Sequence, residues 1–130
     1  MDNDTNIIAR KLFRIFKIDD DFEIWVGKND HSNDLLTFKY SSQNDLWFHV
    51  RGSSGSHVLL KCLTDELKPT KEHIRTAAEI TAYYSKSRNA NNVKVAYTNV
   101  KNVKKYKGAD TGSVVIKGEK LIKVNPKIAE

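Results

Sequence analysis

The stretch that decides the fold is Asp45-Leu46-Trp47-Phe48-His49-Val50-Arg51-Gly52-Ser53-Ser54-Gly55-Ser56-His57-Val58. Residues 45–51 alternate between two kinds of side chain, which predicts a β-strand because successive side chains of a strand point to opposite faces. The apolar face carries Leu46, Phe48 and Val50. The opposite face carries Trp47, His49 and Arg51. We therefore expect the first face to pack in a core and the second to form a site.

The glycine-serine loop after this strand indicates a binding role. Its glycines can adopt positive φ, and its N–H and hydroxyl donors suit an anionic group such as phosphate. The run that follows, residues 57–62, predicts a second strand, which we expect to pair with the first across the loop. Depending on the register of that pairing, His57 and Lys61 share the face that carries Trp47.

The rest of the sequence predicts several short strands and one long helix. Residues 70–88 begin with a helix-start signal, Pro69-Thr70-Lys71, and continue with apolar residues at helical spacing. Residues 7–13 fit either a short helix or an extended lead-in. The further predicted strands are 14–18 and 22–26 around a turn of three aspartates, 35–40, 93–97, and a C-terminal hairpin of 113–117 with 120–124. The fold class is thus α+β, a mostly antiparallel sheet with one main helix.

Length and composition bound the class of protein. The 130 residues fit a single domain over 1–130, with a core at about 14–125 after a short polar N-terminal tail. No apolar run approaches the roughly 20 residues that span a bilayer, and the first residues lack a secretory signal, so we expect a cytoplasmic protein without membrane contact. Cys62 is the only cysteine, which excludes an intrachain disulfide, and its apolar surroundings predict a buried side chain. We expect no metal and no cofactor.

The basic residues are segregated along the chain. There are 22 Lys and Arg against 16 Asp and Glu, a formal net charge of +6. Residues 80–109 contain seven basic side chains and no acidic one. Such a segment is typical of a protein that binds a polyanion, either nucleic acid or an anionic membrane. The alternative is a solvated lysine face that only confers solubility.

Four separated motifs add a family resemblance. In chain order they are Asp45-Leu46-Trp47-Phe48-His49, Gly55-Ser56-His57-Val58, Ala82-Tyr83-Tyr84-Ser85-Lys86-Ser87-Arg88 and Val100-Lys101-Asn102-Val103-Lys104-Lys105. Together they resemble the NFACT-R domain, formerly a domain of unknown function, over about residues 22–124. Many relatives have proline where this chain has Ser54, Tyr106 and Thr111, which affects the rigidity of these loops.

The resemblance implies RNA binding, above all to tRNA on a large ribosomal subunit that carries a stalled nascent chain. In the larger RqcH and NEMF ribosome-quality-control factors this domain accompanies further domains, none of which fits within these 130 residues. A separate protein partner would then supply them. The tail-directing motif of such factors lies in one of those other domains, so RNA binding is the function that carries over.

We therefore predict an RNA-binding module. Its cations would follow phosphates, while the loop and the polar strand face would contact a backbone or an exposed base, with Tyr83 or Tyr106 available for stacking. The predicted nucleic-acid-binding residues are Trp47, His49, Arg51, Ser53, Gly55, Ser56, His57, Lys61, Lys86, Arg88, Lys101, Lys104, Lys105 and Lys107.

Two other functions stay open. An RNA-modifying or RNA-processing enzyme could use His49 and His57 as an acid–base pair, with Asp45 orienting one imidazole and Arg51 stabilising negative charge. The sequence shows no recognisable nucleophile, cofactor loop or complete metal set, which favours binding over catalysis. The third possibility is an adaptor that binds DNA or a protein.

Overall fold

The structure, a computed structural model, describes residues 3–64 and 66–128. β1 (Phe13–Lys17) and β2 (Phe22–Gly27) form the expected antiparallel hairpin. The Asp19 carboxylate closes the turn by accepting hydrogen bonds from the backbone N–H groups of Asp21 (2.9 Å) and Phe22 (3.0 Å). The aspartates therefore serve the turn, as an Asx residue commonly does.

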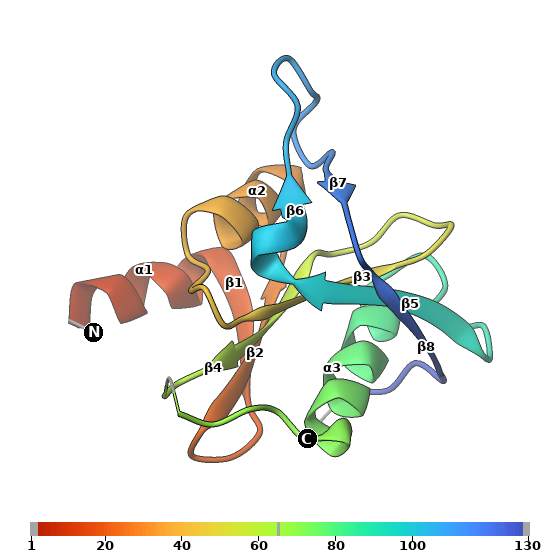
Figure 1. Cartoon of the computed structure of the whole chain (residues 1–130), viewed down its shortest axis with the longest axis horizontal. Coiled ribbons are helices and arrows are strands. Elements are labelled where there is room, and N and C mark those ends of the chain that lie inside the picture. The colour runs from red at the N-terminus through yellow and green to blue at the C-terminus, as the bar shows by residue number, and fades with distance from the viewer. Residues whose placement is uncertain (1–2, 65, 129–130) are drawn as a thin grey trace.

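Six strands form one antiparallel sheet in the order β1-β2-β4-β3-β5-β8 (Figure 1). β3 (Leu46–Val50) and β4 (Val58–Cys62) pair across the glycine-serine loop, with Trp47 opposite Leu59. β5 (Val93–Asn99) pairs with β3, and β8 (Lys120–Val124) pairs with β5. The α+β class and the pairing across the loop are confirmed.

The sheet is covered on both faces. α3 (Lys71–Tyr83) packs its small residues Ala77 and Ala78 against the face that carries Phe48. α1 (Asn3–Leu12) and α2 (Asp30–Phe38) lie with the opposite face, where Trp47 is 1% exposed. The face of β3 that was predicted to form a site therefore also contributes to a second hydrophobic core, through Trp47.

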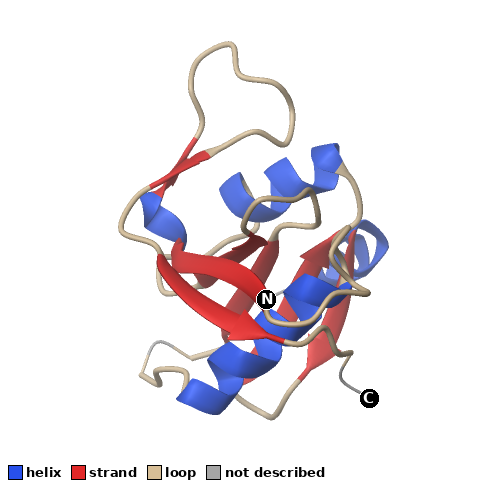
Figure 2. Cartoon of the chain, turned by 90° about the vertical axis from the view of Figure 1, so that its right-hand side faces the viewer, coloured by secondary structure: helices blue, strands red, loops and turns tan. Residues whose placement is uncertain are grey.

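A short arm projects beyond the sheet. It follows a 3₁₀ turn (Val100–Asn102) and comprises residues 103–116, in which β6 (Val103–Lys104) pairs with β7 (Val115–Ile116). Figure 2 shows the arm rising away from the sheet, next to a helix that Figure 1 labels α2. We call residues 103–116 the arm from here on.

Two predicted elements are corrected by the structure. Residues 35–40 were expected as a strand but belong largely to α2, which begins at a capping box between Asn29 and Ser32 and buries Leu36. The predicted pairing of 113–117 with 120–124 is also wrong: β7 pairs with β6 and β8 with β5, so the chain passes through Gly118 from one sheet to the other. At the N-terminus, where both readings were open, a helix runs to Leu12.

The main helix is shorter than expected and ends at Tyr83 instead of near residue 88. Beyond it, the Tyr84 carbonyl accepts a hydrogen bond from the Ser56 N–H (3.0 Å), and Ser85 forms an antiparallel bridge with Gly55. These contacts draw the chain out of the helix and onto the glycine-serine loop. They also position the candidate site.

Candidate functional site

The glycine-serine loop is held by the segment that leaves α3, residues 84–88. The Lys86 N–H donates to the Ser54 carbonyl (3.0 Å), and the hydroxyls of Ser53 and Ser87 lie 3.0 Å apart. A Cβ on Gly55 would lie 2.7 Å from Cβ of Ser85, closer than side chains approach. Glycine is therefore required here for close backbone approach, and the loop is a fixed structural feature.

The loop that the sequence predicts to bind a phosphate uses part of its donors for contacts within the protein. The Ser56 N–H is taken by the Tyr84 carbonyl, and the His57 N–H donates to Oδ1 of Asn33 (3.1 Å). The Ser53 hydroxyl is bound to Ser87. Three donors of the loop, two N–H groups and one hydroxyl, are thus engaged within the protein.

His57 is buried against the second core. It is 3% exposed, and its ring meets Trp47 edge to face with centroids 5.0 Å apart. Its Nδ1 lies 3.5 Å from Oγ1 of Thr37, which also accepts a hydrogen bond from Nε1 of Trp47 (3.1 Å) and donates to the Asn33 carbonyl (2.9 Å). The Thr37 hydroxyl proton is already used, so the neutral tautomer that fits this contact carries its proton on Nδ1.

The two histidines are in contact and both favour the neutral form. The rings of His49 and His57 meet edge to face with centroids 5.2 Å apart. Burial, followed by the effect of His49, lowers the pKa of His57 to about 3. Burial likewise lowers the pKa of His49. The pair therefore presents neutral rings at physiological pH, which can hydrogen-bond and stack but do not attract phosphate as cations.

The histidines open into a pocket of about 360 Å³. Its walls come from three parts of the chain that are distant in sequence: the first turn of α2, β3 with the glycine-serine loop that follows it, and the descending side of the arm. The residues that line it are Asp30, Asn33, Trp47, His49, Ser54, Gly55, His57, Gly112, Ser113, Val114 and Ile116. The volume is at the lower end of the roughly 300–1,000 Å³ typical of ligand sites.

The sequence did not reveal the contribution of α2 and the arm to this pocket. Asp34 joins the two elements: its carboxylate accepts the Gly112 N–H (3.1 Å) and lies 3.2 Å from Nζ of Lys105. The signal that could have identified α2 is the N-cap pattern from Asn29 to Ser32. For the arm, the signal is Gly112, whose φ is 88°.

The predicted cations fall into two groups. Lys105 is half-buried and donates to the carbonyls of Asp110 (2.9 Å) and Ser113 (2.8 Å) besides its contact with Asp34, so it braces the arm. The exposed cations are Arg51, Lys86, Arg88, Lys101, Lys104 and Lys107.

One of these cations covers a predicted stacking residue: the Arg88 guanidinium lies over the ring of Tyr83, 4.1 Å from its centroid. The Tyr83 ring is thus covered on one face, which leaves Tyr106, 68% exposed, as the open aromatic group on the arm.

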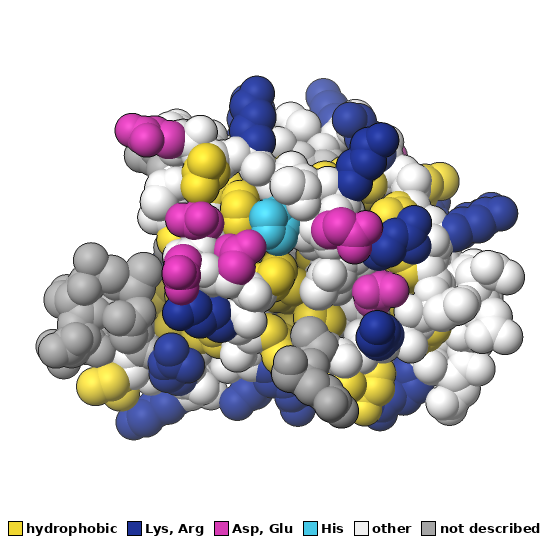
Figure 3. Space-filling view, turned by 90° about the horizontal axis from the view of Figure 1, so that it is seen from below, with side chains coloured by type: hydrophobic (Ala, Val, Ile, Leu, Met, Phe, Trp, Pro, Cys, Tyr) yellow, Lys and Arg dark blue, Asp and Glu magenta, His cyan; other side chains and the backbone are white. Residues whose placement is uncertain are grey.

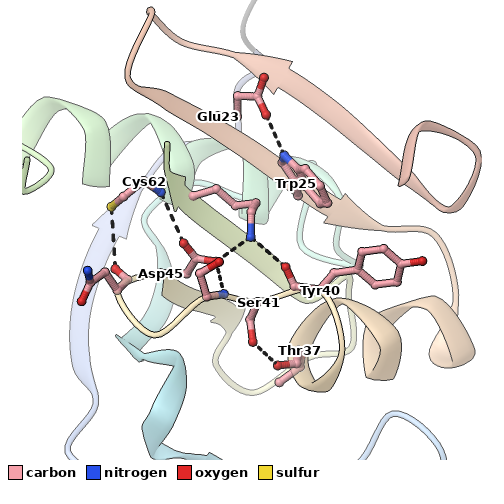
Figure 4. A network of polar contacts seen from close by, with 10 residues as sticks. Glu23, Trp25, Thr37, Tyr40, Ser41, Asp45 and Cys62 are labelled. Carbon is pink, nitrogen blue, oxygen red and sulfur yellow. Dashed lines mark hydrogen bonds and ion pairs between the residues drawn. The ribbon is translucent and has the colours of Figure 1, made fainter. Parts of the chain in front are cut away.

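Lys61 does not belong to the site, contrary to the prediction. It is 5% exposed, and its Nζ donates to the carboxylate of Asp45 (2.7 Å) and the carbonyl of Tyr40 (2.8 Å). The ammonium also lies 4.9 Å from the centroid of the Trp25 ring. Figure 4 shows Asp45, Tyr40 and Trp25 converging on this position. The proposed role of Asp45 in orienting an imidazole is likewise wrong, because its carboxylate binds Lys61 and two backbone N–H groups.

The comparison with known families identifies the chain. Residues 12–118 match the family described as NFACT protein RNA binding domain. The chain belongs to this family. In the described residues of this NFACT-R domain, no helix is long and apolar enough to cross a membrane.

Relatives of the NFACT-R domain are found in bacteria and animals. It is 43% identical over 103 residues to the Rqc2 homolog RqcH of Streptococcus suis, an alignment that covers 79% of this chain and 18% of that protein. It is 32% identical over 106 residues to coiled-coil domain-containing protein 25 of Mus musculus, covering 79% of this chain and 50% of that one. The chain thus spans half or less of the length of these two relatives.

A solved structure shares the fold. It is described as the C-terminal of the fibronectin/fibrinogen-binding protein from Streptococcus suis, and it superposes with a TM-score of 0.80 at 40% sequence identity. The superposition covers 88% of this chain and 45% of that one. The α+β arrangement described above is therefore that of the NFACT-R family.

Proposed function

We propose that this NFACT-R domain binds RNA through exposed cations on two elements that border one pocket. Lys86 and Arg88 lie on the segment that leaves α3 and is bonded to the glycine-serine loop. Lys104 and Lys107 lie on the arm, whose descending side lines the same pocket. This arrangement of free cations around a pocket is the observation that carries the proposal, because phosphate contacts from Lys and Arg supply most of the affinity for RNA.

The opposite end of the molecule is less suited to a polyanion. Figure 3 views the molecule from below, away from the arm, and acidic side chains lie there among basic ones. The exposed carboxylates of Asp19 and Asp20 belong to the β1–β2 turn. A folded RNA would meet mixed charge at that end, whereas the exposed cations Lys86, Arg88, Lys104 and Lys107 border the pocket beside the arm.

The RNA that we propose is tRNA on the large ribosomal subunit, in the cytoplasm. This choice is supported by the similarity to a protein named as an Rqc2 homolog, and the proposal extends to a role in ribosome quality control. The alignment covers 18% of that relative, and our proposal for this chain is confined to RNA binding by this domain, with a separate protein as a further partner. The 130 residues form a single binding domain in this proposal.

The test is fluorescence anisotropy of the protein titrated into labelled tRNA, a single-stranded RNA and a duplex DNA, each over a salt series. We expect the tightest binding to tRNA, with an affinity that falls steeply as salt rises because counterions are released from the phosphates. Equal binding to duplex DNA would favour a general polyanion module. No binding to any of the three at low salt would overturn the proposal and turn attention to a protein adaptor.

A further inference from the structure

The lining of the histidine pocket differs in charge from its rim. At its mouth lies the exposed carboxylate of Asp30, in the first turn of α2. Lys105 of the arm is engaged with Asp34 and two carbonyls. The imidazoles of His49 and His57 are shielded from charging by burial. The pocket therefore disfavours a phosphate, although the cations around it favour one.

The pocket offers hydrogen-bond acceptors from two side chains, His57 and Asp30, beside the donor groups of Asn33, Ser54 and Ser113. The contact between His57 and Thr37 requires the His57 proton on Nδ1, so Nε2 of this neutral ring carries a lone pair. Within the part of the chain that the structure describes, Nε2 of His57 has no hydrogen-bond partner. Every fully buried side-chain nitrogen or oxygen in that part does have a partner, so Nε2 is not fully buried and reaches the pocket surface. The Asp30 carboxylate adds further acceptors. The Asn33 side chain lines the same pocket, and because its oxygen already accepts the His57 N–H, its NH₂ group is a donor for a base carbonyl.

We propose that this pocket holds an unpaired nucleobase that bears an exocyclic amino group, while the surrounding cations hold the phosphates on either side of it. The inference rests on the proposed RNA binding and deepens it. A single-stranded base can be turned out of its stack, placed against aromatic rings and read through its donor and acceptor edge. Here the half-buried ring of His49 supplies the aromatic wall, and it contacts the rings of both Trp47 and His57, with centroids 5.9 Å and 5.2 Å away.

Cytosine and uracil provide a matched pair of ligands. Both are single-ring pyrimidines, but cytosine offers an N4 amino donor where uracil offers an O4 acceptor. A carboxylate and an unprotonated imidazole nitrogen can both accept from the amino group, whereas a carbonyl oxygen in the same place would face other acceptors without a proton between them. We therefore expect short oligocytidylate RNA to bind more tightly than oligouridylate of the same length.

The first experiment compares fluorescein-labelled oligocytidylate and oligouridylate of nine nucleotides, by anisotropy, for the wild type and for Asp30→Asn. We expect at least about a fivefold preference of the wild type for oligocytidylate, equal to about 1 kcal/mol. In Asp30→Asn we expect this ratio to fall toward one while the salt dependence stays the same, because no phosphate contact is lost. Asp20→Asn, which makes the same change in charge on the β1–β2 turn, should retain the wild-type ratio.

The results separate the pocket from the RNA-binding surface. Salt-dependent binding of both oligonucleotides with equal affinity in the wild type would overturn the base pocket and leave RNA binding intact. Absence of binding to both at low salt would overturn both proposals. A preference that persists unchanged in Asp30→Asn would show that the discrimination arises elsewhere.

A second measurement locates the ligand without relying on a variant. Cytidine and uridine monophosphates are titrated separately into the ¹⁵N-labelled protein, and amide shifts are followed by NMR. Gly55, in the glycine-serine loop, and Gly112, in the arm, both line the pocket. The amide signals of both should shift with cytidine monophosphate, and much less with uridine monophosphate. Shifts confined to the exposed lysines, or identical for both nucleotides, would overturn the assignment.

Discussion

Replacing Lys61 by methionine should destabilise the domain without touching its RNA-binding surface. The Asp45 side chain is fully buried and receives hydrogen bonds from Nζ of Lys61 (2.7 Å), the Ser42 N–H (2.8 Å) and the Cys62 N–H (3.3 Å). Methionine keeps the packing on Trp25 but leaves the carboxylate without its cation. Removing one partner of a buried ion pair typically costs about 3–5 kcal/mol, a large part of the roughly 5–15 kcal/mol that stabilises a domain.

The assay is urea unfolding followed by tryptophan fluorescence and circular dichroism, with Lys120→Met as the control. Lys120 is exposed on β8, and its replacement should change the unfolding free energy by no more than about 0.5 kcal/mol. Adding Asp45→Asn to Lys61→Met should recover part of the loss, because the amide needs no counterion. Below the unfolding transition, Lys61→Met should bind RNA as the wild type does. A loss below about 1 kcal/mol for Lys61→Met, or a selective loss of RNA affinity, would refute the structural role of Lys61.

Three further predictions concern the site. The pKa of His57 is about 3 in the folded protein and about 6.5 in the unfolded chain, so the unfolded chain binds a proton that the folded protein does not. The free energy of unfolding should therefore fall as pH drops through this interval, by at most about 1.4 kcal/mol per pH unit. Urea titrations at several pH values should show a smaller loss for His57→Gln. Gly55→Ala should lower the free energy of unfolding by about 1–3 kcal/mol, because the new Cβ clashes with the segment that leaves α3. In Gly108→Ala the new Cβ meets no neighbour within 4 Å, so the loss should be about 1 kcal/mol, from the positive φ alone. Equal losses of stability in thermal unfolding would contradict this difference. Lys105→Met should free the arm and speed hydrogen exchange of the Gly112 amide, and unchanged exchange would show that Lys105 does not brace it.

The strands around the glycine-serine loop could be predicted because their alternation reflects a local property of extended chains. Residues 46–50 and 58–62 pair as expected, and the register places His57 with Trp47. The turn at Asp19 and the helix start at Thr70 were also readable, since both depend on hydrogen bonds between neighbouring residues.

The errors arose where long-range contacts override local preference. Leu35-Leu36-Thr37 is compatible with a strand, but the capping box and burial of Leu36 against the second core favour a helix. Lys61 alternates with apolar neighbours as a solvent-facing lysine would. Its partner Asp45 lies 16 residues away, and nothing local in the sequence indicates that the two are buried together.

The site shows the same division. Its histidines and loop could be found as a motif, but the close approach of Gly55 to Ser85 and the bracing of the arm by Asp34 depend on the assembled fold. The charge run of 80–109 was visible, whereas the separation of Lys105 from the exposed lysines was not. This separation changes which lysines are worth substituting in an RNA-binding test.

The most direct test of RNA binding by the rim of the pocket is therefore the double variant Lys104→Glu with Lys107→Glu, titrated with tRNA over a salt series. Lys68→Glu with Lys71→Glu is the control, because both lysines are exposed near the start of α3 and the change in charge is identical. We predict that the first variant reduces the dependence of log affinity on log salt by about two and weakens binding about tenfold or more, with the control much less affected. Equal effects of the two variants, or none from the first, would contradict RNA binding at this rim.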